Sequence, residues 1–187
     1  EMCIRDSYDS RRGRRVYERS LLFVFLLAVR TLFPGVRVHI DYSIGAGIYA
    51  TVQKDPPLTQ ADVEALRDEC RRIVEADYPL VRQRMDIDDA IDFFAADGQT
   101  DKVDLLEWRR FTYFDVYSVG AFKDYFYGEM VPSTGYVSVF DLRLEDGGVL
   151  LQRPDTRDPS RPSTYVPMPK LAAAFRESDE WGRLLHC

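Results

Sequence analysis

The most apolar part of the chain runs from Val16 to Phe33 and contains nine consecutive apolar residues, LLFVFLLAV. A helix built from this segment is apolar on nearly all sides, so other elements must enclose it. We therefore expect it at the centre of the fold, with Pro34 and Gly35 ending it. The preceding RRGRR imitates the start of a secretory signal, but no small-residue cleavage site follows, and the run is too short to span a bilayer.

Alternation of apolar and polar residues predicts strands in both halves of the chain. VRVHIDYSI (36–44) and GIYATV (47–52) flank a Gly-Ala-Gly turn and predict a β-hairpin. PLVRQRM (79–85) predicts another strand. In the second half, an antiparallel sheet is expected from RFTYFDVYSV (110–119), YVSVFDLRL (136–144) and GGVLLQR (147–153). The aromatic segment AFKDYFYGEMVPSTG is predicted to be a loop that borders any site.

Further helices are predicted between and after these strands. LTQADVEALRDECRRIVEAD carries Thr59 as N-cap with Asp62 three residues later, and its apolar stripe includes Cys70, which we interpret as a core residue. Two short helices, MDIDDAIDFFAADGQ and TDKVDLLEWRR, follow the third predicted strand. The acids that crowd the start of the first of these are explained by the helix dipole, because they lack the spacing of a calcium loop.

Together these elements predict an α+β fold in which an antiparallel β-sheet wraps around a central apolar helix. Residues 1–15 are expected to be a leader, disordered or partly non-native, and residues 16–153 form the domain. Residues 154–187 comprise a proline-rich connector and a last helix, KLAAAFRESDEWGRLL.

Composition and charge exclude several classes of protein. Of the 187 residues, 45% are hydrophobic and 13% aromatic, which is too much apolar surface for a disordered chain. The net charge of −6 disfavours simple electrostatic binding of nucleic acid. The first 38 residues are nevertheless basic, and they are interpreted as a solvated lead-in or, alternatively, as a contact for a phosphate or an acidic partner surface. The residues that could make such a contact are Arg11, Arg12, Arg14, Arg15 and Arg19.

The chain lacks the motifs of the common enzyme classes. It contains no GxxxxGK(S/T) phosphate loop, GxGxxG fingerprint, HExxH zinc helix or GxSxG elbow. Of its two histidines, His39 is expected on the polar face of its strand and His186 lies next to the end of the chain. Its three cysteines have no paired spacing, which fits a reducing cytoplasm, and no membrane association is expected.

The order of segments resembles a known architecture. The run RSLLFVFLLAVRTLFPGVRVHIDYSIGAGIYATV, followed by LTQADVEALRDECRRIVEADYPLVRQRM, DDAIDFFAADGQTDKVDLL and DYFYGEMVPSTGYVSVFDL, is similar to the second N-terminal domain of threonyl-tRNA synthetase. That editing domain is shared in outline with alanyl-tRNA synthetase editing proteins. The resemblance covers residues 16–153 and implies the fold of that family.

In that family an HxxxH pair and a CxxxH pair build a metal-binding or hydrolytic site. On this sequence the four positions fall on Arg19, Phe23, Phe126 and Met130, so all four are replaced. Phenylalanine ligates no metal, arginine stays protonated, and a lone thioether is a weak ligand. We therefore expect no metal ligands, no catalytic residues and no cofactor in this chain.

A second resemblance suggests what a region without catalytic residues does. YERSLLFVFLLA, GGVLLQRP and PKLAAAFRESDEWGRLL are similar to the N-terminal region of bacterial uridine kinase-type nucleoside kinases. This implies a non-catalytic accessory region that binds an effector or positions a kinase domain, with ATP and Mg²⁺ needed only by that absent domain. The kinase domain and a second copy of the chain are the expected partners, and tRNA is not. The alternative is a stand-alone tRNA-editing-type hydrolase.

A nucleoside or nucleotide effector would need side chains that stack on a base or bind an anion. The candidates are Arg19, Asp124, Tyr125, Tyr127, Thr134 and Tyr136. The competing interpretation is that Arg19 and Asp124 pair across the former metal site, with aromatic rings filling its volume.

Overall fold

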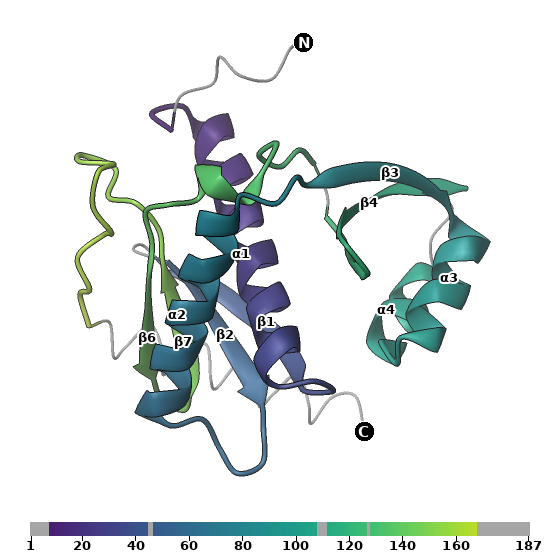
Figure 1. Ribbon diagram of the computed structural model, residues 1–187, viewed down its shortest axis with the longest axis horizontal. Coiled ribbons are helices and arrows are strands. Elements are labelled where there is room, and N and C mark those ends of the chain that lie inside the picture. The colour runs from purple at the N-terminus through teal and green to yellow at the C-terminus, as the bar shows by residue number, and fades with distance from the viewer. Residues whose placement is uncertain (1–7, 45–46, 108–111, 127, 168–187) are drawn as a thin grey trace.

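A computed structural model describes residues 8–44, 47–107, 112–126 and 128–167 (Figure 1). The first helix, α1 (Arg11–Leu32), begins five residues earlier than predicted, so residues 11–15 are helical and not disordered. The reason is a cap, because the Ser10 hydroxyl accepts a hydrogen bond from the Gly13 N–H at 2.9 Å.

The predicted hairpin is confirmed and forms one edge of a four-stranded antiparallel sheet. Its strands β1 (Arg37–Ile44) and β2 (Gly47–Gln53) pair with Ile40 opposite Ala50. The sheet continues through β7 (Gly148–Gln152) to β6 (Asp141–Glu145). The predicted strand at 136–144 begins later than expected, because residues Thr134–Tyr136 form a 3₁₀ turn, η1.

A second, three-stranded sheet has the order β3 (Val81–Asp86), β4 (Tyr113–Val119) and β5 (Phe122–Tyr125). The expectation of one sheet around the helix therefore needs correction, because β4 belongs to a different sheet from β6 and β7. Part of the predicted aromatic loop is strand β5, which folds back on β4 through a tight turn at Gly120, whose φ of +57° suits glycine.

The helical predictions between the sheets are confirmed where they are described. Thr59 and Asp62 form a capping box at the start of α2 (Gln60–Ala76). Asp86 caps α3 (Ile87–Ala96), accepting a hydrogen bond from the Asp88 N–H. Helix α4 (Thr100–Glu107) follows directly. The predicted last helix, and residues 108–110 of the previous one, lie outside the described residues.

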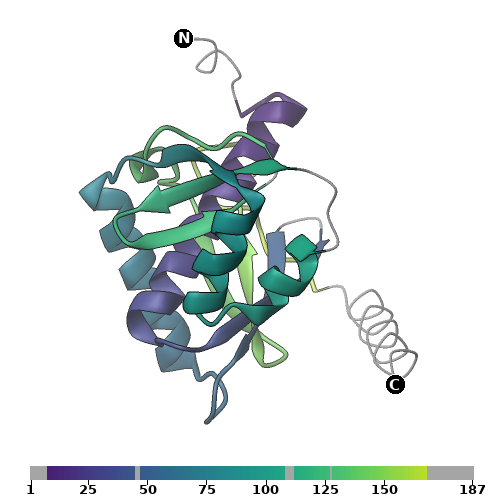
Figure 2. The ribbon, with the colours of Figure 1, turned by 90° about the vertical axis from the view of Figure 1, so that its right-hand side faces the viewer.

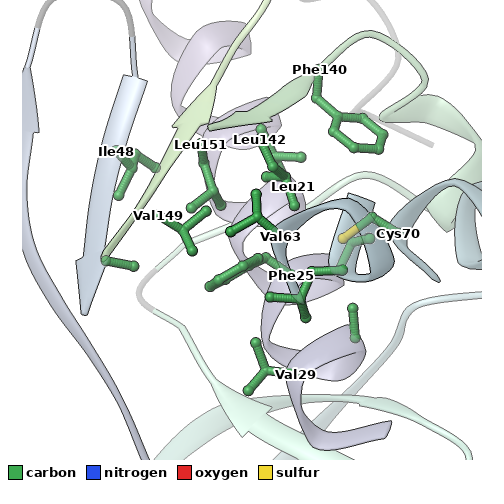
Figure 3. Packing of buried hydrophobic residues seen from close by; sticks show 14 of the residues in the cluster. Leu21, Phe25, Val29, Ile48, Val63, Cys70, Phe140, Leu142, Val149 and Leu151 are labelled. Carbon is green, nitrogen blue, oxygen red and sulfur yellow. The ribbon is translucent and has the colours of Figure 1, made fainter. Parts of the chain in front are cut away.

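Helix α1 packs against both sheets, and this arrangement positions the site. One side of it joins α2 and the four-stranded sheet in the main core, where Leu21, Phe25 and Val29 meet Val63 and Leu151 (Figure 3). Figure 2 shows the three-stranded sheet with α3 and α4 in front of α1. That sheet forms a separate cluster with the helix. Besides residues of α1, α2 and the four-stranded sheet, the main core contains Leu58, Val137 and Phe140 from the connecting segments.

Cys70 lies in the main core and is fully buried, as predicted. Burial raises the pKa of its thiol, so the reactive thiolate form is suppressed. None of the described helices combines the length and the apolarity that a bilayer-spanning helix needs.

Candidate functional site

One side of α1 faces β5 and the segment that follows it. Its side chains recur at helical spacing, so they lie in a line along the helix. In chain order they are Arg12, Arg15, Arg19, Phe23, Leu26 and Arg30. Contacts confirm where this line points, because Arg12 pairs with Glu129 and the Phe23 ring packs against Phe122.

Arg19 is the first of the four positions at which the resemblance places metal ligands. Its Nε donates to the Glu129 carbonyl oxygen at 3.0 Å. Its guanidinium lies against Gly128, where an added Cβ would stand 2.9 Å from the arginine Cζ. Partial burial lowers the pKa of the guanidinium, and the neighbouring charge of Arg15 lowers it further.

The other three positions meet in one apolar cluster. Phe23 is fully buried and its ring centroid lies 6.1 Å from that of Phe126. Met130 belongs to the same cluster, together with Tyr117 and Leu80. The structure thus brings the replaced positions together, but their side chains offer two phenyl rings and a thioether.

This set does not fit a metal ion, because a cation needs deprotonated oxygen, nitrogen or sulfur ligands. In the part of the chain that the structure describes, no three His, Cys, Asp or Glu side chains gather in a metal-binding arrangement.

A pocket of about 460 Å³ lies next to this cluster, at the C-terminal end of α1. Its walls are the last turns of α1, residues 34–38, residues 97–102 at the α3–α4 junction, and β5. Phe122 lines the pocket and also contacts Phe23, so the two features share a wall. Val29 and Leu26 supply apolar surface.

The first ion pair of the pocket joins α1 to the α3–α4 junction. Arg30 approaches Asp97 with both terminal nitrogens, and Nη1 donates to Oδ2 at 2.6 Å. The Gln99 amide also donates to Asp97 Oδ2, at 2.6 Å. The hydrogen bond from Arg30 holds the pKa of Asp97 below its usual range, so Asp97 is ionised at neutral pH.

The second ion pair, Lys102 with Asp124, joins α4 to β5. The Asp124 carboxylate is only 6% exposed, and its Oδ1 also accepts a hydrogen bond from the Tyr125 N–H at 2.7 Å. Asp124 therefore pairs with Lys102 and not with Arg19, and the alternative of an Arg19–Asp124 pair is wrong. The physical reason is that the Arg19 side chain extends toward Glu129, where it bonds the backbone carbonyl oxygen.

The structure separates the other predicted ligand residues. Tyr125 packs its ring against Phe94 and Phe114 on the α3 side of its sheet. The Thr134 hydroxyl is buried and bonds backbone groups of Ile73 and Tyr78. Tyr136 is exposed, and Tyr127 lies outside the described residues. Among the five candidates that the structure describes, only Asp124 lines the pocket.

Sequence reasoning missed most of the polar residues of the pocket. They are Arg30, Arg37, Asp97, Gln99 and Lys102. Arg30 offered one usable signal, since it stands at the end of the apolar run in helical register with Arg12 and Arg19. Asp97 and Lys102 carry no such signal, because they reach the site through the packing of two short helices.

No protein-family model matches the chain. It is similar to the threonine–tRNA ligase of Symbiobacterium thermophilum, with 34% identity over 137 residues, which cover 73% of this chain and 21% of that protein. The threonine–tRNA ligase of Oleidesulfovibrio alaskensis is 34% identical over 134 residues, covering 72% of this chain and 21% of the ligase. That of Desulfovibrio desulfuricans is 30% identical over 180 residues, covering 95% of this chain and 28% of the ligase.

These relatives correct one sequence-based expectation. The similar proteins are threonyl-tRNA synthetases, so the interpretation as an accessory region of a nucleoside kinase is wrong, and the kinase domain is not supported as a partner. The alternative interpretation, a tRNA-editing-type domain, agrees with them better. The chain spans only about a fifth to a quarter of the length of these curated relatives.

Proposed function

We propose that this chain is a tRNA-editing-type domain that hydrolyses the ester between an amino acid and the 3′ end of a tRNA. The observation that carries the proposal is the similarity to threonine–tRNA ligases, which extends over 95% of the chain in one relative. The pocket beside α1 is the proposed site, because it combines apolar walls with both signs of charge.

The polar groups of the pocket suit the parts of an aminoacyl ester. An α-ammonium group requires an anionic acceptor, which the pocket offers in the carboxylate of Asp97. The ester carbonyl requires a hydrogen-bond donor, which Lys102 supplies as an ammonium group. Leu26 and Val29 offer apolar surface for the side chain of the amino acid.

The proposed reaction adds water to the ester carbonyl carbon. The carbonyl oxygen gains negative charge, which the Lys102 ammonium stabilises by hydrogen bonding. The bond between the acyl carbon and the ribose oxygen then breaks, and the proton lost by the water ends on that oxygen. The products are the free amino acid and a tRNA with a free terminal hydroxyl.

The role of Asp124 in this proposal is to position Lys102. Its buried carboxylate, held by the Tyr125 N–H, fixes the lysine against the wall of the pocket. The four replaced positions take no part, because Arg19, Phe23, Phe126 and Met130 hold no metal ligand set.

Two measurements on the 187-residue chain test this proposal. The first follows the release of the amino acid from a tRNA of the kind threonine–tRNA ligases use, charged with an amino acid other than threonine. We expect Lys102→Met to slow this release by about 100-fold, as when one oxyanion donor is lost. Lys123→Met is the matched control, because Lys123 lies on the same strand as Asp124 but stacks over the Phe93 ring.

The second measurement is calorimetric binding of a 3′-aminoacyl-amide analogue of adenosine, which resists hydrolysis. We expect Asp97→Asn and Asp124→Asn to weaken binding, while Asp92→Asn, on the exposed side of α3, leaves it unchanged. Absence of both hydrolysis and analogue binding in the unmodified chain would contradict the proposal.

A further inference from the structure

We propose that Arg12, Arg15 and Arg19 form a phosphate-binding track that guides a tRNA along α1 toward the pocket. We call these three residues the arginine track. This inference rests on the proposed function and adds the surface on which the nucleic acid lies.

Helix geometry determines on which side of α1 each of the five arginines near its start lies. With 3.6 residues per turn, positions 12, 15 and 19 lie on one side, Arg11 lies at the edge of that side next to Arg15, and Arg14 points away from it. Arg12 and Arg30 are five helical turns apart and so share this side, separated by ~27 Å along the axis. The arginine track and the pocket therefore lie at the two ends of the same side of α1, with the buried Phe23 between them.

Contacts with the segment after β5 hold the track in place. Arg12 pairs with the Glu129 side chain at 2.8 Å, and Arg19 donates to the Glu129 carbonyl oxygen at 3.0 Å. The Arg12 side chain remains 65% exposed, and Arg15 is exposed. The fold therefore orients Arg12 and Arg19, while Arg12 and Arg15 remain accessible to a ligand.

The terminal nitrogens of Arg19 strengthen this assignment. Nε is the nitrogen that bonds the Glu129 carbonyl, while both terminal nitrogens lie 3.0 Å from where a Gly128 Cβ would stand. A planar guanidinium fixed in this way presents paired N–H donors, the arrangement that matches two phosphate oxygens. Arg15, one turn earlier, crowds it with like charge, which an anion would relieve.

A further arginine borders the same area from the three-stranded sheet. Arg82 of β3 pairs with Asp115 of β4, and it is close enough to Glu129 to feel its charge. Cations from two elements thus surround a single glutamate. The chain as a whole has a net charge of −6, whereas the charge of this area is positive.

The direction of the track favours a nucleic acid over an acidic protein. Phosphates recur along a strand, so a row of arginines along a helix can neutralise several in sequence. The row leads to the pocket proposed for the aminoacyl end of the same molecule. The net negative charge elsewhere repels the backbone, which leaves the track as the favoured approach.

The test measures binding of an uncharged tRNA transcript, of the kind threonine–tRNA ligases use, by fluorescence anisotropy between 50 and 200 mM salt. The variant is Arg12→Gln with Arg15→Gln. The control is Arg71→Gln with Arg72→Gln, which removes the same charge from exposed positions of α2 that also form ion pairs. We expect the track variant to weaken binding at least tenfold and to reduce the salt slope by about two, roughly one for each lost phosphate contact.

An equal loss in the control variant, or an unchanged salt slope in the track variant, would overturn the arginine track. Polyglutamate that competes as well as RNA at equal charge would assign the track to an acidic protein and overturn it as well. The proposed function is judged separately, because binding of the adenosine analogue depends on the pocket alone. If the track variant still binds the analogue while it loses the transcript, both proposals are supported.

Discussion

The guanidinium of Arg19 fills the space into which a side chain at Gly128 would project. The Cβ of such a side chain would lie 2.9 Å from Cζ and 3.0 Å from each terminal nitrogen of the arginine. The φ of Gly128 is +106°, a conformation that residues with a side chain rarely adopt. Position 128 thus requires glycine for two independent reasons.

Gly128→Ala is expected to destabilise the protein by about 2–4 kcal/mol, because backbone strain and a displaced arginine both contribute. Urea unfolding measures the change. Gly120→Ala is the matched control, since Gly120 also has a positive φ but has nothing within 4 Å of an added Cβ. We expect the control to lose only about 1 kcal/mol. Equal losses would show that the arginine does not occupy this space in solution.

Phe25→Ala is expected to cost about 3–5 kcal/mol, because the ring is fully buried in the main core and its removal leaves a cavity (Figure 3). Leu27→Ala should cost clearly less, since Leu27 is only partly buried on the same helix. Chemical denaturation of both variants measures the two losses in the free energy of unfolding. A smaller loss for Phe25→Ala than for Leu27→Ala would mean that α1 is packed differently.

Thr134→Val is expected to destabilise the protein by about 1–3 kcal/mol while keeping its volume. The hydroxyl donates to the Ile73 carbonyl oxygen at 2.7 Å and accepts from the Tyr78 N–H at 2.9 Å, so its loss removes the partner of one buried and one partly buried backbone group. Thr134→Ser keeps the hydroxyl and should retain most of the stability. Thermal melting compares the two, and indistinguishable melting temperatures would contradict this role.

Acid is expected to weaken the Arg30–Asp97 link between α1 and the α3–α4 junction. The hydrogen bond from Arg30 lowers the pKa of Asp97 in the folded protein, so between this pKa and the unfolded value, about 3.9, the unfolded chain binds more protons. The stability from this pair is present above the unfolded pKa and is lost as pH falls through the folded one. Asp97→Asn should therefore flatten the fall in stability below pH 4.

The check is urea unfolding of both proteins at several pH values between 2.5 and 7. Asp92→Asn, at an exposed position of α3, should leave the acid dependence as it is. If Asp97→Asn shows the same slope as the unmodified chain, Asp97 is not held by Arg30 in solution.

The pattern of apolar and polar residues predicts the secondary structure correctly where the residues of one helix or hairpin are sufficient to determine it. The hairpin at 37–53, the capping box of α2 and the burial of Cys70 follow from alternation, a capping pair and an apolar stripe. The start of α1 was placed too late, because Ser10 caps a turn whose residues are polar and show no apolar period. The return of β5 on β4 was missed because its residues also suit a loop.

By itself, the sequence determined that α1 is buried, that the chain contains both helices and antiparallel strands, and that the four positions of the resembling family carry no metal ligands. Only the tertiary structure decided which polar groups share a pocket. Asp97 meets Arg30 across 67 residues of chain, and Lys102 of α4 meets Asp124 of β5. Periodicity describes the face of a single element, whereas these pairs depend on how two sheets and two short helices pack around α1.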